Sequence, residues 1–113
     1  MTHYLLAVYL APGDRAADAA HSPEEAEQKV VAFTQTLADS GQLVYSCDLD
    51  DPETAVYTSA GGQLGDGPLH PAADQVDGFW IVDVPTRTQA QALAVRAADA
   101  CGKSVALRPM RAQ

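Results

Sequence analysis

The sequence predicts an α+β fold in which two helices cover one face of an antiparallel sheet. Two segments show helical apolar spacing with capping signals at both ends, and strand-like runs lie before, between and after them. Two of those runs also carry apolar side chains on both alternating faces. With 113 residues, the chain is expected to form one domain, residues 1–113, whose core needs no metal or disulfide.

The first strand is expected at residues 3–10, HYLLAVYL. Its aromatic and branched residues favour a strand, and its apolar groups point to both faces, which is typical of a strand covered on both sides. Residues 11–21 are small or polar and contain glycine and proline, so they are expected to form a loop.

The first helix is expected over residues 22–41, SPEEAEQKVVAFTQTLADSG. Ser22 is placed as the N-cap, Pro23 as the first helical residue and Glu25 as the partner in a capping box. Gly41 is expected to end the helix as its C′ residue. One apolar stripe follows the helical spacing and consists of Ala26, Val30, Phe33 and Leu37.

Two further strand-like runs, residues 43–49 and 54–60, are joined by the turn-rich residues 50–53 and are expected to form a hairpin. The acidic residues in and around this link do not have the spacing of a calcium loop, so we interpret them as a solvated turn. These residues are Asp48, Asp50, Asp51 and Glu53.

The second half of the chain contains a strand, a helix and a last strand. The strand is expected at residues 78–84, GFWIVDV, and the last strand at residues 104–110. Between them, Thr86 is placed as the N-cap of a helix that Gly102 ends. The apolar stripe of this helix consists of Ala90, Leu93, Ala97 and Cys101.

The resulting order, β-α-β-β-α-β, is that of the ferredoxin-like fold. Two helices shelter only one face of such a sheet, whereas the strands at residues 3–10 and 78–84 are apolar on both faces. The bare face would form a larger apolar patch than soluble monomers usually tolerate, and each side chain buried there recovers roughly 1.5–3 kcal/mol. We therefore expect a homodimer packed sheet against sheet.

A series of short motifs runs along almost the whole chain in a characteristic order. They are the N-terminal YLL strand, the S-P-E-E helix start, D-G-P at 66–68, G-F-W-I-V-D-V at 78–84 and the closing V-x-L-R-P-M. In this order they resemble the YCII-related family, and specifically its DGPF branch. The resemblance implies a ferredoxin-like fold that dimerises as an α+β barrel.

The resemblance implies little about activity, because most members of the family are uncharacterised. Some relatives are proposed to use a histidine on a helix, with an aspartate near the end of that helix, as an acid–base pair. Asp39 resembles that aspartate, whereas Val30 stands where the histidine would fall. The sequence after D-G-P also departs from the family pattern, with Leu69 in place of Phe and residues 70–73 (HPAA) in place of an acidic-Thr-Lys continuation.

The loop GDGPLHP, residues 65–71, is the strongest candidate for chemistry. Asp66 and His70 lie four positions apart around the stiffening Pro68, and a carboxylate that orients an imidazole makes a general base near pH 7. The alternative, which we favour, is a turn in which Asp66 bonds backbone amides, Gly67 adopts a positive φ and His70 is solvated. The catalytic pair remains the functional hypothesis for this loop.

Three aromatic residues on strands are candidates for the wall of a ligand cavity, namely Trp80, Tyr57 and Tyr45. Packing in the core or in the dimer interface is the alternative for all three. His21 either approaches the site or packs over the first turn of the helix. Arg108 either binds an anion or forms a salt bridge with Asp83, which is the interpretation we favour.

Charge and composition exclude several partners. The 15 acidic and 7 basic residues leave a formal net charge of −8, which repels nucleic acids and anionic membranes. The N-terminal apolar run has no preceding Lys or Arg and is too short to span a bilayer, so a cytoplasmic protein is expected. Cys47 and Cys101 lack the spacing of a metal or redox motif, and we expect buried free thiols, with a disulfide as the alternative.

No G-x-G-x-x-G, P-loop, G-x-S-x-G or metal-ligand spacing is present, so neither a cofactor nor a metal is expected. The predicted function is acid–base catalysis, an isomerisation, elimination or cyclisation, on a small apolar or carbonyl-bearing metabolite. His70 would accept or donate the proton, and the carboxylate of Asp66 or Asp39 would orient the imidazole of His70. The alternative is a non-catalytic ligand-binding or regulatory dimer. Two titratable groups within hydrogen-bond reach in the cavity would favour catalysis.

Overall fold

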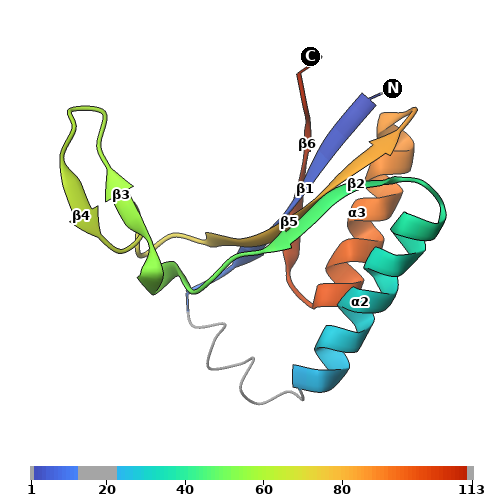
Figure 1. Ribbon diagram of the computed structural model, residues 1–113, viewed down its shortest axis with the longest axis horizontal. Helices are drawn as coiled ribbons and strands as arrows, with labels where there is room; N and C mark the ends of the chain where they lie inside the picture. Colours follow the sequence, from blue (N-terminus) through green and yellow to red (C-terminus); the bar gives the residue numbers. More distant parts are fainter. Residues whose placement is uncertain (1, 13–22, 112–113) are drawn as a thin grey trace.

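The computed structural model describes residues 2–12 and 23–111. Two helices, α2 (Pro23–Asp39) and α3 (Arg87–Cys101), pack on one face of a four-stranded antiparallel sheet (Figure 1). The strands occur in the order β2-β5-β1-β6, which is the ferredoxin-like arrangement that the sequence predicts. Their bounds are Thr2–Leu10 for β1, Leu43–Asp48 for β2, Gln75–Val84 for β5 and Ser104–Pro109 for β6.

The two central strands, β1 and β5, carry most of the core of the sheet. They pair antiparallel with Leu6 opposite Trp80, and buried and half-buried residues alternate along β5. The alternation arises because one face of the sheet packs against the helices while the other face is open. The core beneath the helices consists of Tyr4, Leu6, Val8, Phe33, Leu37, Trp80, Val82, Val84, Ala90, Leu93 and Ala97.

The helix ends follow the predicted caps where the structure describes them. Gly41 has a φ of 74°, and it donates a hydrogen bond to the carbonyl of Ala38, while Gln42 donates one to the carbonyl of Leu37. These two bonds form the Schellman motif. The hydroxyl of Thr86 accepts a hydrogen bond from the Gln89 amide at the start of α3. Gly102, with a φ of 67°, ends that helix, whereas the predicted N-cap Ser22 lies outside the described residues.

The hairpin predicted between residues 43–49 and 54–60 is wrong. β2 pairs with β5, while β3 (Val56–Thr58) pairs with β4 (Leu64–Asp66) in a separate two-stranded hairpin. A single turn of 3-10 helix, Pro52–Thr54, lies between β2 and β3. Pairing with the long strand β5 places β2 beside the core. The next strand in sequence, β3, has only three residues and offers fewer cross-strand contacts.

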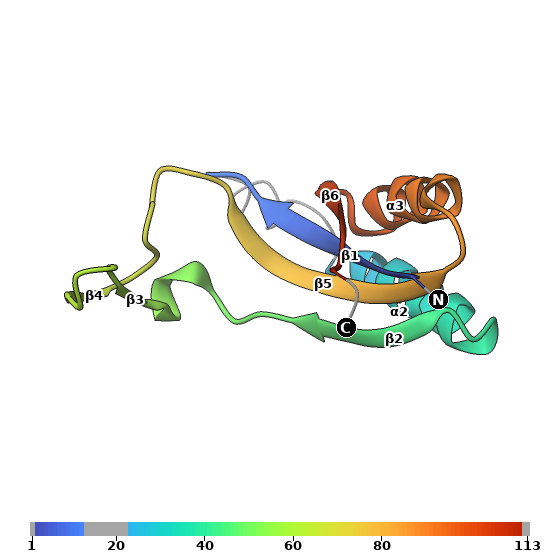
Figure 2. The ribbon, with the colours of Figure 1, turned by 90° about the horizontal axis from the view of Figure 1, so that it is seen from above.

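Residues 49–74 form an extension, here called the arm, that projects away from the helices at the opposite end of the molecule (Figures 1 and 2). The ring of Tyr57 lies against Gly65 across the arm's hairpin, where a Cβ would collide with it. Several large apolar side chains of the arm are exposed, and Leu64 is 73% accessible. No helix in the described parts of the chain is long and apolar enough to cross a membrane.

Candidate functional site

Two adjoining cavities lie between α2 and the sheet. Both are lined by Val8, Val30, Asp48 and Trp80, and we call the two together the helix–sheet cavity. Their volumes of about 250 and about 440 Å³ lie around the lower end of the range of small-molecule sites. The cavity therefore has room for a compact metabolite rather than a polymer.

Trp80 forms a fixed part of the cavity wall. Its side chain is only 4% exposed, and its ring meets Phe33 edge to face with the ring centroids 5.2 Å apart. The indole Nε1 donates a hydrogen bond of 2.9 Å to the Thr34 hydroxyl, which in turn donates one of 2.8 Å to the Val30 carbonyl. This chain of bonds satisfies the buried indole and joins α2 to β5.

Asp77 reaches the cavity because of a β-bulge in β5. Val8 pairs with Gly78 and Tyr9 pairs with Val76, so Asp77 is an extra residue without a partner on β1. Regular alternation would place Asp77 on the same face as Phe79, away from the helices. With the bulge, Asp77 lines the cavity instead.

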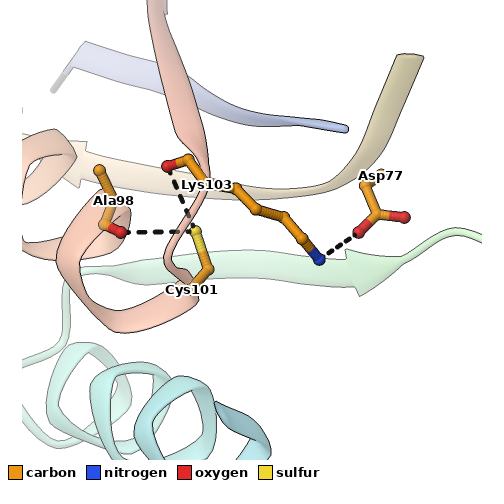
Figure 3. Close-up of polar contacts among 4 residues, drawn as sticks. All are labelled: Asp77, Ala98, Cys101 and Lys103. Atoms are coloured by element: carbon orange, nitrogen blue, oxygen red, sulfur yellow. Dashed lines mark hydrogen bonds and ion pairs between the residues drawn. The ribbon is translucent and has the colours of Figure 1, made fainter. Parts of the chain in front are cut away.

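Lys103 holds the Asp77 carboxylate from the other side of the cavity. Its Nζ lies 3.0 Å from Asp77 Oδ2, and the two side chains are only 20% and 28% exposed (Figure 3). Lys103 arrives there because Gly102 ends α3 and turns the chain back toward the sheet. The ion pair is therefore built from two segments that are distant in sequence.

The thiol of Cys101 also lines the cavity and points at the carbonyls of Ala98 and Lys103 (Figure 3). Burial is the main cause that raises the pKa of this thiol, and the negative charge of Asp77 adds to it. A hydrogen bond with the Lys103 backbone and the positive charge of Lys103 act in the opposite direction and lower the pKa. A thiol with a raised pKa is protonated at neutral pH and is a poor nucleophile.

Gly78 allows β2 to approach the floor of the cavity. A Cβ at this position would lie 2.9 Å from the Cys47 carbonyl oxygen and 3.3 Å from Asp48 Oδ1. The Asp48 carboxylate thus lies over Gly78, and Asp77 is the next residue along the chain. Asp48, Asp77 and Lys103 thus line the cavity beside the apolar side chains of Val8 and Trp80.

Comparison with known families assigns the chain to one of them. The model of the YCII-related domain matches residues 3–110. The chain belongs to the YCII-related family. Val30, which stands where the resemblance would place a histidine, lines both parts of the cavity. None of the curated proteins matches the chain.

The residues predicted for catalysis lie elsewhere in this family member. Asp66 ends β4 and His70 follows on the arm, and both are exposed. Within the described chain, no hydrogen bond or ion pair joins their side chains, and neither is among the described residues that line the cavity. Gly67 has a φ of 91°, as the turn interpretation predicted. Asp39 is exposed at the end of α2, where it accepts a hydrogen bond from the Gln35 side chain.

The residues predicted as ligand contacts are also spread over the molecule. Trp80 lines the cavity, whereas Tyr57 belongs to the arm and Tyr45 is 55% exposed on β2. Arg108 is exposed on β6. The expected salt bridge between Arg108 and Asp83 is wrong, because Asp83 lies beside His3 at 3.9 Å. His21 lies outside the described residues.

Four polar residues that line the cavity were not predicted from the sequence, namely Glu27, Asp48, Asp77 and Lys103. Asp48 was interpreted as part of a solvated turn, although it closes a strand beside the core. The charged neighbour of a strand glycine, as in Asp77-Gly78, is a weak sign of a bulge. No local pattern could have paired Asp77 with Lys103.

Proposed function

We propose that the helix–sheet cavity is the site of cofactor-free acid–base catalysis on a small carbonyl-bearing metabolite. The observation that carries this proposal is the pair of ionisable groups, Asp77 and Lys103, which are held 3.0 Å apart and line the helix–sheet cavity. Charged groups paired in a partly dry cleft are candidates for proton-transfer chemistry. Membership in the YCII-related family names no reaction of its own.

The proposed reaction moves a proton between two carbon atoms of the substrate. Lys103 donates a hydrogen bond to the substrate carbonyl and stabilises the negative charge that develops on its oxygen, while Asp77 holds the ammonium in place. Asp48 accepts the proton from the carbon beside the carbonyl and returns it to a second carbon, which gives an isomerisation. The apolar wall with Trp80 excludes water from the reacting carbon. An elimination or cyclisation would use the same groups.

A competing assignment places the acid–base pair on the arm, at Asp66 and His70, with Asp39 as another candidate carboxylate. These residues stay a prediction. No hydrogen bond joins their side chains within the described chain and none of them is among the described lining residues, so they have less support than the residues of the cavity.

The test is the exchange of α-protons of small ketones in D₂O, followed by ¹H NMR for the native protein and for Asp48→Asn, Lys103→Met and His70→Ala. We expect both cavity variants to lose roughly 10²-fold or more in exchange rate, and His70→Ala to keep it. Exchange that is lost only in His70→Ala would move the chemistry to the arm. A ketone that binds the native protein without exchange would leave the non-catalytic binding module as the function.

We also propose that a second copy of the chain covers the open face of the sheet. Leu5, Phe79 and Ile81 point away from the helices and are only half-buried in one copy. On the same face, Asp83 Oδ1 is buried without a hydrogen-bond partner in the described chain, and Arg108 is exposed. The two opposite charges support a self-complementary contact across a two-fold axis.

Sedimentation equilibrium at micromolar concentration tests this assembly. We expect twice the 11.9 kDa of one chain for the native protein, and one chain for Tyr45→Lys and Ile81→Lys on the open face. Val95→Lys is the matched control, because Val95 is 70% exposed on α3, on the other side of the molecule. Circular dichroism checks that each variant folds. A native protein that sediments as a monomer would overturn the proposal.

A cytoplasmic location is part of the same proposal. Both cysteines, Cys47 and Cys101, are free thiols, which fits a reducing compartment. Fractionation of cells that express the chain with an epitope tag tests the location, and recovery outside the cytoplasm would contradict it.

A further inference from the structure

We infer that the carbonyl-bearing ligand of the helix–sheet cavity also carries a positive charge, on an amino group attached to a short apolar body. This inference rests on the proposed function, since it names the class of ligand for the same cavity. It comes from the sign of the charges that line the cavity and from where those charges lie relative to the apolar wall.

The charged side chains that line the cavity are mostly acidic. Glu27, Asp48 and Asp77 are carboxylates, and Lys103 is the single ammonium among the described lining residues. Asp77 lies 3.0 Å from Lys103, so these two charges largely offset each other. Glu27 and Asp48 remain, and they leave an excess of two negative charges at the cavity.

The position of the two remaining carboxylates sets the orientation of the ligand. Glu27 on α2 and Asp48 at the end of β2 are exposed, whereas Trp80 and Val8 of the wall are buried. An amine at the opening gains a charge-assisted hydrogen bond with Glu27, and Asp48 attracts it at longer range, while its apolar body and carbonyl enter the cavity. A carboxylate ligand would lose hydration and meet like charges. Low-dielectric walls strengthen both effects, because they focus the field of the charges.

Three small molecules that share one branched carbon body separate the effect of charge from that of shape. They are isopentylamine, which is a cation at neutral pH, the neutral 3-methylbutanamide and the anion 3-methylbutanoate. Binding is measured by saturation-transfer NMR and calorimetry at low salt. We expect the amine to bind roughly tenfold tighter than the amide, and the carboxylate to bind more weakly than either.

Two variants locate this preference. Asp48→Asn and Glu27→Gln should each lower the affinity for the amine roughly two- to fivefold and leave that for the amide unchanged. Glu25→Gln is the matched control, because it removes the same charge from an exposed residue of α2 that is not among the described lining residues.

The outcomes distinguish this inference from the function on which it rests. An amide or carboxylate that binds at least as tightly as the amine would overturn the inference and leave the cavity as the binding site. The inference would also be overturned if Glu25→Gln lowered the affinity for the amine as much as Asp48→Asn does. If the native protein binds none of the three molecules and exchanges no ketone protons, both the inference and the proposed function are overturned.

Discussion

Lys103 Nζ lies 3.0 Å from Asp77 Oδ2, although the two residues are 26 positions apart and the whole of α3 lies between them. The contact ties the segment that follows α3 to the bulged start of β5. It depends on the bulge that turns Asp77 toward the helices. The same ion pair therefore joins two segments of the fold and lies in the proposed catalytic site.

Breaking this ion pair should cost a modest amount of stability. We expect Lys103→Met and Asp77→Asn each to lower the free energy of unfolding by about 1 kcal/mol, because the pair is only partly shielded from water. Urea denaturation of both single variants and of the double variant measures the coupling. Lys29→Met, an exposed lysine on α2, is the control. Strictly additive effects would show that the two groups do not interact in solution.

Gly78→Ala should destabilise the sheet by about 1–3 kcal/mol. The new Cβ would lie 2.9 Å from the Cys47 carbonyl oxygen, which is backbone and cannot move without a shift of β2. Gly61→Ala is the matched control, since the nearest atom, the Ser59 hydroxyl oxygen, would be 3.9 Å away. Thermal and urea unfolding of the two variants provide the comparison. Equal stability of both variants would contradict this close approach of the two strands.

Thr34→Val should lower stability by about 1–3 kcal/mol, because the buried indole N–H of Trp80 would lose its acceptor. Thr36→Val makes the same replacement on the same helix. The Thr36 hydroxyl also donates to a carbonyl one turn earlier, that of Ala32, but the residue is exposed. We expect its effect to stay within about 0.5 kcal/mol. A loss of similar size in both variants would assign the effect to the intrahelical bond rather than to Trp80.

Cys101 should make stability fall at high pH. Burial raises the pKa of its thiol above the ordinary value of 9.0, so the unfolded chain loses this proton at a lower pH than the native protein does. The contribution of Cys101 is fully present below pH 9.0 and is lost as the pH rises toward the raised pKa of the native thiol. Urea unfolding of Cys47→Ala and of Cys47→Ala/Cys101→Ala at about pH 8 and about pH 10 measures it. If both proteins lose the same stability over this range, the thiol is not responsible.

Alkylation with iodoacetamide gives a second view of the same thiol. In Cys47→Ala, the single remaining cysteine should react more slowly in the native state than in urea, because the thiolate is the reactive form and burial also restricts access. Equal rates in the two states would mean that Cys101 is open to solvent in the native protein.

Both helices could be predicted from the sequence because their signals are local. Gly41 and Gly102 take the left-handed conformation that a helix end needs, and Thr86 caps the first turn of α3. The central strands were also predictable, since runs of apolar residues on both faces, as at residues 3–10 and 78–84, are typical of strands in the middle of a sheet. The fold class follows from the order of these elements.

The partner of β2 could not be predicted in the same way. Residues 43–49 and 54–60 have the alternation of a hairpin, yet β2 joins β5 and leaves the later strand to the arm. Strand pairing depends on contacts between distant parts of the chain, and a favourable local turn does not decide it. The homodimer remains a prediction, because it depends on contacts between two copies of the chain, and the structure contains one copy.

By itself, the sequence determined the helices with their ends, the two central strands and the acidic character of the surface, since each depends on neighbouring residues or on composition. Only the tertiary structure decided which polar groups line the cavity. A single extra residue in β5 turns Asp77 to the helix face, and the end of α3 brings Lys103 to meet it. Apart from Gly78, which is a weak sign of the bulge, neither event leaves a pattern in the sequence, because each arises from the register of strands and the packing of a helix far along the chain.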